Sequence, residues 1–501
     1  MELLDHLAMG FHAALSLQNL MYATIGVVLG TAIGVLPGLG PVPTIAMLLP
    51  LTYALPPESA VIMLAGIFYG SQYGGSTTSI LVNIPGESSS VVTCLDGHQM
   101  ARKGRAGSAL ATAAIGSFFA GSVATILVAA FAPTLSRLAF QFGPAEYFSL
   151  MLLGLIGAVA LAHGSILRAV GMILVGVLLS LVGTDITSGG QRFTAGLSQL
   201  FDGIEFVALA MGLFGLAEVI CNAGNSLHRE LVTRKVSGLW PSREDFRRMT
   251  PAIFRGTALG SVLGLLPGGG ATLSSFAAYA LEKKVSNRPT AFGTGVVEGV
   301  AAPESANNAA AQTSFIPMLT LGLPSNAVMA LMIGALMLHN IQPGPQVIST
   351  NPTLFWGLVA SMWIGNIILV ILNLPMIFIW VKILSVPYRY LYPSIIVISC
   401  IGVFSVTNDA FGVFLMAAFG AFGYLLVRLG CEIAPMLLGF VLGQSLEAYF
   451  RRAMLISDGS FTVFFSRPLS AALLLMAAIV VVMFMVPAFS RKREEVFQEA
   501  E

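Results

Sequence analysis

The sequence predicts an all-α polytopic membrane protein with about 10–14 membrane segments, arranged as two homologous repeats whose helices are broken by Pro and Gly. Three observations support this fold class. Of the 501 residues, 56% are hydrophobic and 10% are charged, whereas a soluble domain is roughly 25% charged. Apolar runs long enough to cross a bilayer recur along the chain. A segment near residue 30 also recurs near residue 260.

The apolar runs exceed what a soluble protein buries, because a single hydrophobic core stops growing near about 250–300 residues. A spanning helix needs roughly 20 apolar residues. Such runs lie near 20–50, 58–82, 108–132, 146–183, 204–221, 252–281, 312–340, 354–384, 390–427, 434–447 and 468–489. Four of them, 20–50, 58–82, 252–281 and 312–340, contain Pro and Gly breaks. We therefore expect some segments to be broken helices or re-entrant hairpins.

The loops and the repeat divide the chain into four parts. We expect a first membrane repeat at 15–225, a basic cytoplasmic loop at 226–250, a second membrane repeat with C-terminal helices at 251–490, and a cytoplasmic tail at 491–501. The long loop, the cluster at 102–105 and the cluster at 491–493 are rich in Lys and Arg, which is typical of cytoplasmic segments. The basic loop 283–288 lies on the same side only if the run 252–281 turns back.

The internal repeat has a spacing of 230 residues. Residues 26–40 read GVVLGTAIGVLPGLG and residues 256–270 read GTALGSVLGLLPGGG, with eight of fifteen positions identical. Each copy places glycines at i, i+4 and i+8, which gives one smooth helix face for close packing. A Leu-Pro-Gly sequence follows, and Pro lacks the amide donor of a continuous helix. We expect helix breaks at Pro37, Gly38, Gly40, Pro267, Gly268 and Gly270.

The paired breaks point to a function. Broken backbone survives in a bilayer only where protein or a water-filled cavity surrounds it. Paired broken helices in the two halves of a hydrophobic chain indicate the binding site of a transporter. One copy alone is explained equally well by packing glycines and a helix kink, whereas two copies in register favour a site. We expect the repeats to meet at their breaks, and the sequence leaves their relative direction open.

Each copy of the repeat is followed, after a further span, by a polar stretch within an apolar region. These stretches cover residues 69–90 and 298–326. Their hydroxyl and amide groups, with the amides at helix N-termini, bind a dehydrated carboxylate without a buried formal charge. Any single Ser or Thr is more often an interhelical hydrogen bond. Together they predict a substrate site of Ser76, Thr77, Thr78, Ser88, Ser89, Thr313, Ser325 and Asn326.

A coupling cation needs oxygen ligands, and a coupled proton needs a titratable group. Ionisable side chains inside a membrane are costly and usually functional. The sharpest signals are Glu298 and Glu304, while Glu87, Asp185 and Asp409 are weaker. An interfacial position in water explains each of these carboxylates equally well. The residues expected to serve cation or proton coupling are Asn83, Glu298, Glu304, Asn307 and Asn308.

Motifs of other protein classes are absent from the sequence. The chain has no GxxxxGK(S/T) nucleotide loop and no HExxH, and its Cys and His residues show no metal-ligand spacing. We expect no enzyme activity, no cofactor and no metal site. A net charge of +1 gives no sign of a nucleic-acid partner. Transport must therefore draw on an ion gradient, with sodium or a proton as coupling ion, or on an external motor subunit.

Five long motifs carry a resemblance to a known family. They are GVLPGLGP at 34–41, YGGSTTSILVNIPGESSSVVTCLDGHQMARKG at 73–104, GLLPGGGATLSSFAAYALEKK at 264–284, GVVEGVAAPESANNAAAQTSFIPMLTLGLPSNAVMALMIGAL at 295–336, and HNIQPGP at 339–345. These stretches closely resemble the large membrane subunit of the tripartite tricarboxylate transporters, the TctA family. The resemblance extends over residues 15–490.

The resemblance implies a three-component secondary active transporter, a symporter of the bacterial inner membrane driven by sodium or protons. The chain would be its translocation subunit, working with a periplasmic solute-binding protein and a small four-helix membrane subunit. The implied solutes are citrate and other organic carboxylates, and their identity is set largely by the binding protein. The assignment of individual binding residues rests on the breaks and polar stretches, and the resemblance does not supply it.

Two functions of other classes remain open on the sequence. A membrane scaffold would dock the binding protein while another subunit forms the path, although a scaffold has no need of paired breaks. An intramembrane enzyme would use Glu298 and Glu304 as paired acids, and it would change its substrate covalently.

Overall fold

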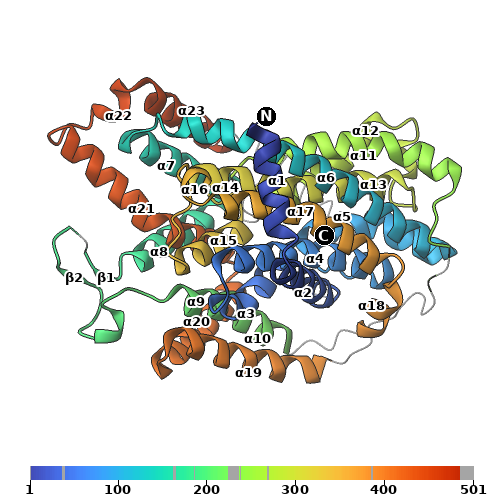
Figure 1. Ribbon diagram of the computed structural model, residues 1–501, viewed down its shortest axis with the longest axis horizontal. Coiled ribbons are helices and arrows are strands. Elements are labelled where there is room, and N and C mark those ends of the chain that lie inside the picture. Colours follow the sequence, from blue (N-terminus) through green and yellow to red (C-terminus); the bar gives the residue numbers. More distant parts are fainter. Residues whose placement is uncertain are drawn as a thin grey trace.

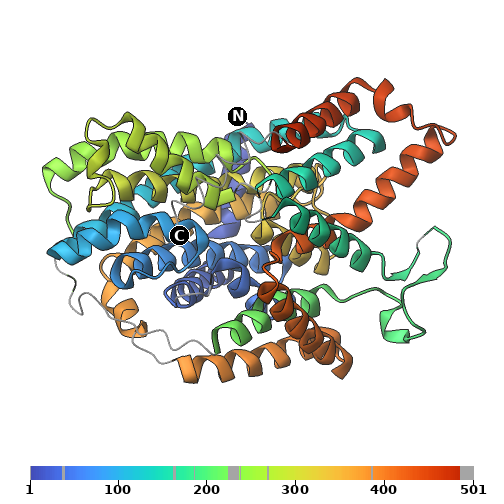
Figure 2. The ribbon, with the colours of Figure 1, turned by 180° about the vertical axis from the view of Figure 1, so that it is seen from behind.

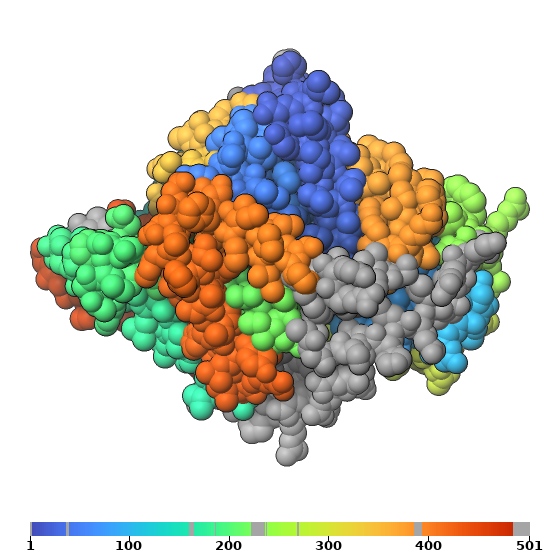
Figure 3. Space-filling view, turned by 90° about the horizontal axis from the view of Figure 1, so that it is seen from below, coloured from blue at the N-terminus to red at the C-terminus, as the bar shows by residue number. Residues whose placement is uncertain are grey.

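The computed structural model describes residues 2–36, 40–161, 165–185, 187–223, 236, 238–267, 270–384 and 388–485. Within these ranges the chain is helical, and its strands are one short antiparallel pair, β1 (Gly183–Thr184) and β2 (Gln191–Arg192). Figures 1 and 2 show a broad stack of helices from which the β1–β2 segment projects at one edge. In the space-filling view, the orange residues of α19 and α20 lie beside that green segment (Figure 3).

The helices of the first half are α1 (Glu2–Ala14), α2 (Leu17–Gly34), α3 (Pro41–Tyr53), α4 (Pro57–Val82), η1 (Ser88–Ser90), α5 (Val91–Thr93), η2 (Cys94–His98), η3 (Ala101–Arg105), α6 (Ala106–Ala139), α7 (Pro144–Leu161), α8 (Ile166–Ser180), η4 (Ser198–Leu200), α9 (Phe206–Ala210), η5 (Met211–Leu216) and α10 (Ala217–Ala223). Those of the second half are α11 (Arg243–Leu263), α12 (Gly270–Val285), η6 (Pro289–Ala291), α13 (Glu298–Thr313), α14 (Phe315–Leu321), α15 (Ala327–Leu338), α16 (Val347–Thr350), α17 (Pro352–Asn373), α18 (Ile377–Ile383), α19 (Tyr388–Thr407), α20 (Ala410–Arg428), α21 (Ala434–Ile456), α22 (Val463–Ser466) and α23 (Pro468–Met485).

Several helices have the length and composition of membrane spans. Four described segments are long and apolar enough to cross a bilayer, at Leu17–Gly34, Ala101–Ala139, Pro352–Asn373 and Ala410–Arg428. Further apolar helices have only 10–17 residues, fewer than the roughly 20 that a straight span needs. The predicted all-α membrane fold with broken helices is confirmed.

The first copy of the sequence repeat packs α2 against α4 through its glycines. A Cβ atom on any of the three glycines would lie 2.2–2.3 Å from a carbonyl oxygen of α4, so only Gly fits. The facing pairs are Gly26–Met63, Gly30–Ile67 and Gly34–Ser71. Residue numbers rise together along both helices, so α2 and α4 run parallel and α3 returns between them.

The second copy builds the same arrangement from α11 and α13. The facing pairs are Gly256–Ala302, Gly260–Ala306 and Gly264–Ala310, with Cβ positions 2.2–2.5 Å from the opposite carbonyl oxygens. These two helices are also parallel, and α12 returns between them. The run 252–281 therefore turns back at its break, as the basic loop 283–288 required.

The two repeats are inverted relative to each other. Ser76 of α4 donates a hydrogen bond to Glu304 of α13. Tyr69, about two turns earlier on α4, lies with its ring 6.1 Å from that of Phe315, which follows Glu304. Residue numbers therefore decrease along α4 in the direction in which they increase from Glu304 to Phe315, so α4 and α13 are antiparallel. Because each is parallel to its own glycine helix, α2 and α11 enter the protein from opposite ends.

The basic segments of the two halves lie at one end of the molecule. Arg105 forms an ion pair with Asp245 at the start of α11, with 2.7 Å between Nη2 and Oδ1. Lys103 donates to the carbonyl of Thr294. Asp96 accepts backbone hydrogen bonds from Gly293, Gly295 and Val296, which closes the loop of the second half onto the first.

Helices outside the repeats pack mainly as a flank. Gly176 of α8 and Gly439 of α21 each face a carbonyl of the other helix, which joins the end of the first half to the C-terminal helices. The N-terminal helix α1 lies against α17, where His6 stacks on Trp356 with 5.2 Å between ring centroids. Figure 1 shows α7, α8, α21, α22 and α23 gathered on the side away from α11 and α12.

Candidate functional site

A cavity of about 550 Å³ lies where the two repeats meet. Four of its wall segments begin helices, and each repeat supplies two of them. They are 40–43 at the start of α3, 85–89 leading into η1, 270–273 at the start of α12 and 326–328 at the start of α15. The volume falls in the range of small-molecule sites.

Convergent helix N-termini make this cavity attractive to anions. The first four N–H groups of a helix have no partner within the helix, and the helix dipole adds positive potential at the same end. The start of α3 exposes little of this donor capacity, because Pro41 and Pro43 lack an N–H group and Val42 lies between them. The start of α12 (Gly270 to Leu273) contains no Pro, so it retains all of its backbone donors.

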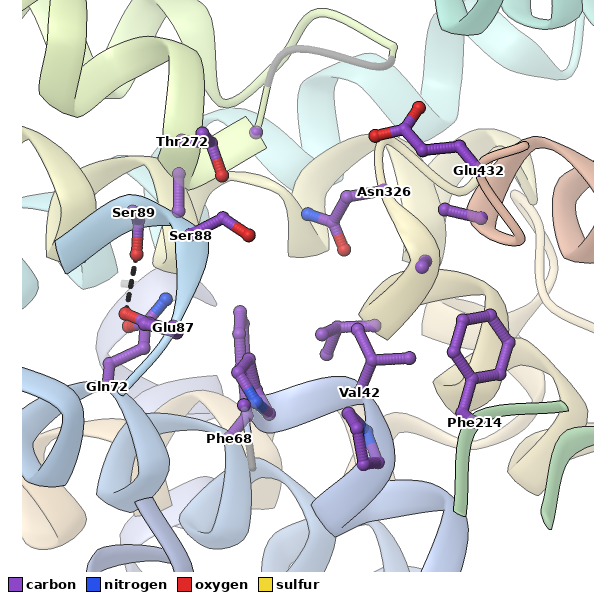
Figure 4. Close-up of a pocket in the computed structure, with 18 of the residues that line it drawn as sticks. Val42, Phe68, Gln72, Glu87, Ser88, Ser89, Phe214, Thr272, Asn326 and Glu432 are labelled. Atoms are coloured by element: carbon purple, nitrogen blue, oxygen red, sulfur yellow. Dashed lines mark hydrogen bonds between the residues drawn. The ribbon is translucent and has the colours of Figure 1, made fainter. Parts of the chain in front are cut away.

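Polar and apolar side chains occupy different walls of the cavity. Figure 4 shows Phe68, Val42 and Phe214 along one side and polar groups around the rest. The hydroxyls of Ser88 and Thr272 point into the space. Asn326 caps α15 by accepting a hydrogen bond of 3.0 Å from the Met329 amide, and the rest of its side-chain amide faces the cavity.

Two buried polar groups at the cavity lack a hydrogen-bond partner among the described residues. Gln72 lies on the cavity wall fully buried, and neither its Nε2 nor its Oε1 is paired. Ser325, next to Asn326, is 1% exposed and its hydroxyl is unpaired. An unpaired buried polar group costs about 1–3 kcal/mol. An oxygen of a ligand in the cavity would accept a hydrogen bond from Nε2 of Gln72.

The charged side chains on the cavity wall are all acidic. Glu87, Glu218 and Glu432 line it, and no Lys, Arg or His from the described part of the chain does so. Glu87 is buried, and its Oε1 accepts hydrogen bonds from Ser89 Oγ at 2.5 Å and from Asn307 Nδ2 at 3.1 Å. The backbone thus presents positive potential to the cavity, while the side chains present carboxylates.

A second polar cluster surrounds Glu304, which is 1% exposed. Its carboxylate accepts hydrogen bonds from Ser76 of α4, at 2.7 Å, and from Thr93 of α5. The side chain of Asn308 donates to Ser117 of α6 at 2.7 Å. A cavity of about 10 Å³, lined by Ser76, Ser117 and Glu304 among others, adjoins the cluster. That volume is comparable to the roughly 10–15 Å³ that one water occupies, and a dehydrated cation is no larger.

The predicted substrate residues divide between the two clusters. Ser88, Ser89 and Asn326 line the large cavity, and Ser325 adjoins it. Ser76 and Thr77 instead line the small cavity beside Glu304. Two lie elsewhere: Thr78 donates to the carbonyl of Val35 and so joins α4 to α2, and Thr313 bonds back to Ala309 within its own helix.

The predicted coupling residues also separate. Glu304, Asn307 and Asn308 lie at the interface of the repeats. Glu298 instead forms a two-pronged ion pair with Arg248, with distances of 2.7 and 2.8 Å. Asn83 is exposed and ends α4 in a left-handed conformation at φ 60°. Glu298 and Glu304 thus have separate partners, in contrast to the paired acids that an enzyme would need.

Two of the three weaker acidic candidates, Asp185 and Asp409, lie in loops outside both clusters. Asp409 is exposed and caps α20 by accepting from the amide of Phe411. Asp185 follows β1, where a hydrogen bond from the backbone N–H of Thr187 and the positive charge of Arg451 hold its pKa below the usual value for Asp. Neither residue contacts the cavity.

The helix breaks place their described residues at the cavity or beside it. Gly40 is the N-cap of α3, and Gly270 starts α12 at φ +44°, with Asn326 of the neighbouring wall 3.2 Å from its Cβ position. Pro267 packs against Gly157 of α7. Pro37, Gly38 and Gly268 lie outside the described residues, as do 226–235 and 237 of the basic loop and the whole 491–501 tail.

Several residues of the two clusters were not among the sequence candidates. Gln72 had a usable signal, because a Gln four residues before Ser76 on an apolar helix lies on the same face. Glu87 was only a weak candidate. Thr93, Ser117 and Thr272 had no distinguishing signal, because each becomes relevant only through a neighbour from the other half of the chain.

Inverted repeats whose broken helices end at one shared cavity are characteristic of secondary transporters. The model of the tripartite tricarboxylate transporter TctA family matches residues 20–438, and the chain belongs to this family. It is therefore a membrane-embedded component of a tripartite tricarboxylate transporter, a class that pairs a binding protein with membrane subunits. The predicted family resemblance is confirmed.

Two relatives come from Agrobacterium vitis, and both are described as uncharacterized. One, an "uncharacterized 52.8 kDa protein in TAR-I ttuC' 3'region", is 56% identical over 499 residues, which cover 100% of this chain and 99% of the relative. The other, an "uncharacterized protein in TAR-II ttuC' 3'region", is 56% identical over 240 residues, 48% of this chain and 99% of the relative. No solved structure matches the chain.

Proposed function

We propose that the chain is the translocation subunit of a binding-protein-dependent secondary transporter that takes up citrate or another organic carboxylate across the bacterial inner membrane. The observation that carries this proposal is the convergence of four helix starts, two from each inverted repeat, on one cavity. A helix N-terminus stabilises an anion by about 0.3–2 kcal/mol, so several of them act together on a substrate with more than one carboxylate.

The substrate would lie between the two polar walls. Its carboxylates would accept hydrogen bonds from the backbone of α12 and α15 and from Ser88, Thr272 and Gln72. The apolar wall at Phe68 and Phe214 would cover the carbon skeleton. Because the repeats are inverted, a rocking or sliding movement of one against the other would expose this cavity to each side in turn.

The cluster around Glu304 would hold the coupling ion. It joins α13 of the second repeat to α4 and α5 of the first through Ser76 and Thr93, so an ion there bears on the contact between the repeats. Sodium would find oxygen ligands in this cluster, and a proton would reside on the carboxylate itself. The basic end of the molecule would face the cytoplasm, and a periplasmic binding protein and a small membrane subunit would complete the transporter.

The test is uptake of radiolabelled citrate, followed by a panel of other di- and tricarboxylates, into proteoliposomes that hold this chain and its small membrane partner. Binding protein, sodium gradient and proton gradient are added or omitted in turn. We expect uptake only with the binding protein and one inward gradient. If the solute-binding protein docks but no gradient drives uptake, the result would instead favour a scaffold. Recovery of chemically altered solute would favour an enzyme.

A further inference from the structure

The cavity combines two features of opposite electrostatic sign. Helix starts surround it with positive potential, yet Glu87 lies on its wall as a buried carboxylate. An ionised Glu87 would repel an organic anion in the same cavity, because like charges interact strongly where water is largely excluded. No basic side chain from the described residues lines the cavity to neutralise it. Neutralising Glu87 when the anion binds would remove this repulsion.

The geometry of Glu87 shows how this can happen. Two side-chain hydrogen bonds to its carboxyl group, from Ser89 and from Asn307, end on Oε1, and the backbone N–H of Ser90 also bonds to this side chain. Among the described residues no side chain donates a hydrogen bond to Oε2, and the carboxyl group is on the cavity wall (Figure 4). A proton on Oε2 would leave the two anchoring bonds intact. It would also turn this oxygen into a donor toward a substrate carboxylate, and hydrogen bonds to ionised acceptors are the strong ones.

We propose that Glu87 takes up a proton when the organic anion binds, and that its neutral carboxyl group donates a hydrogen bond to the substrate. This inference rests on the function proposed above and assigns a substrate-contacting residue within it. A proton from the aqueous side would bind to Oε2, and it would leave when the substrate leaves. Glu87 would then exclude the anion whenever it is ionised, which ties substrate binding to proton binding.

A metal cation is a poorer fit than a proton at this position. Of the two groups that anchor the carboxylate, Asn307 presents its N–H donor to it and Ser89 its hydroxyl, while Oδ1 of Asn307 is buried without a hydrogen-bond partner among the described residues. Hard cations require several oxygen ligands. The described residues also contain no group of three or more His, Cys, Asp or Glu that could hold a metal ion.

Other titratable groups around Glu87 are few. Glu304 lies one helix turn before Asn307 on α13, Tyr73 is on α4, and Cys94 starts η2. On α12 the nearest are Tyr279, which is bonded to Asp96, and Glu282, which is paired with Arg255. Glu218 and Glu432 also line the cavity, and Figure 4 shows Glu432 on the side away from Glu87.

The experiment compares citrate exchange at equal pH on both sides of the proteoliposome membrane, over a series of pH values. The variants are Glu87→Gln, which is permanently neutral, and Glu87→Asp, which still titrates. Glu58→Gln makes the same change at the start of α4, outside the cavity. Because citrate itself titrates, each result is read as the ratio to wild type at the same pH. The second readout is accumulation driven by an inward proton gradient.

We expect exchange by Glu87→Gln to exceed wild-type exchange increasingly as pH rises, up to about tenfold per pH unit for one proton. Proton-driven accumulation by this variant should be lost. Glu87→Asp should remain pH-dependent, with a profile displaced from that of the wild type because Asp and Glu differ in their ordinary pKa, and Glu58→Gln should follow the wild-type pH profile. If Glu87→Gln does not fold, a pH profile of Glu87→Asp displaced from that of the wild type would still support the proposal, and an identical profile would overturn it.

Two outcomes would overturn the proposal in distinguishable ways. In the first, the wild type exchanges carboxylate and Glu87→Gln shows a pH profile of the same shape. This result would exclude Glu87 as the site of the proton but would not affect the proposed transport function. The same conclusion would follow if exchange by Glu87→Gln lost its dependence on sodium but kept its dependence on pH. Failure of the wild type to exchange or accumulate any carboxylate of the panel would overturn the transport function itself and this inference with it.

Discussion

The α2–α4 pair and the α11–α13 pair have the same backbone architecture but different chemistry. In both, three glycines spaced by four residues lie against three carbonyls spaced by four residues. Aligned on these contacts, Ile67 corresponds to Ala306, so the position of α4 that matches Glu304 is Ala65. The buried carboxylate of the second repeat thus has no counterpart in the first.

The returning helices differ as well. The start of α3 contains two prolines and presents the amide of Val42, whereas the start of α12 contains none and adds the Thr272 hydroxyl. The first repeat contributes hydroxyls, Gln72 and Glu87 to the shared clusters, and the second contributes Glu304, Asn307 and the hydroxyl of Thr272. The repeated glycines therefore specify where helices end. The side chains that differ between the repeats specify what binds there.

The largest expected effect comes from breaking the shared scaffold. Gly30→Ala and Gly260→Ala each add one Cβ atom, 2.3 and 2.2 Å from a carbonyl oxygen of the facing helix. Overpacking of this kind costs about 1–3 kcal/mol or more. Both variants should give lower thermal unfolding midpoints and less monodisperse protein on size-exclusion chromatography. Gly171→Ala on α8, where no atom lies within 4 Å of the Cβ position, is the matched control. Tolerance of one variant alone would show that the repeats are not mechanically equivalent.

The next effect separates the chemistry of the two repeats. Glu304→Gln keeps the volume of the side chain but removes its charge and its titration between Ser76 and Thr93. We expect gradient-driven accumulation to fall by more than about tenfold, because an ionisable group within the membrane is functional by default, while the thermal midpoint stays near that of wild type. Ala65→Ser at the matching position of α4 is the control. Undiminished accumulation by Glu304→Gln would exclude the carboxylate from coupling.

A smaller effect is expected at the helix starts. Asn326→Ala removes the amide that faces the cavity together with the cap of α15, and loss of a cap costs about 0.5–2 kcal/mol. Asp409→Ala removes a cap from α20 outside the cavity and so isolates that cost. Citrate exchange should show a KM raised by about tenfold in Asn326→Ala and unchanged in Asp409→Ala. Equal KM values in both variants would show that Asn326 does not take part in substrate binding.

The smallest effect is expected at Glu298. Its partner Arg248 is 31% exposed and Glu298 itself 15% exposed, and ion pairs with this much solvent contact contribute about 0–1 kcal/mol. Glu298→Gln should leave gradient-driven accumulation within about twofold of wild type, because Arg248 already neutralises this carboxylate. If Glu298→Gln lost as much gradient-driven accumulation as Glu304→Gln in the same assay, the result would support a role for Glu298 in ion coupling.

The sequence carried much of the fold and part of the candidate site. Glycine spacing and Leu-Pro-Gly sequences are local features, so the sequence can predict faces of close helix packing and helix breaks from them. Ser88, Ser89 and Asn326 were also accessible, because they follow Pro breaks at helix starts. Gln72 and Thr93 could not be ranked, since a polar side chain on a membrane helix has the same local pattern whether it faces a cavity, a neighbouring helix or another polar group.

By itself, the sequence determined the membrane environment, the two repeats, the positions of the breaks and the family. These follow from composition and from motifs that are contiguous in the chain. Only the tertiary structure decided that the repeats are inverted, that Glu298 pairs with Arg248 while Glu304 pairs with Ser76, and that Glu87 faces the same cavity as four helix starts. The physical reason is that each of these facts depends on a contact between residues far apart in the chain. Hydrophobic periodicity and helix-breaking residues specify where a helix ends, but they do not specify its partner.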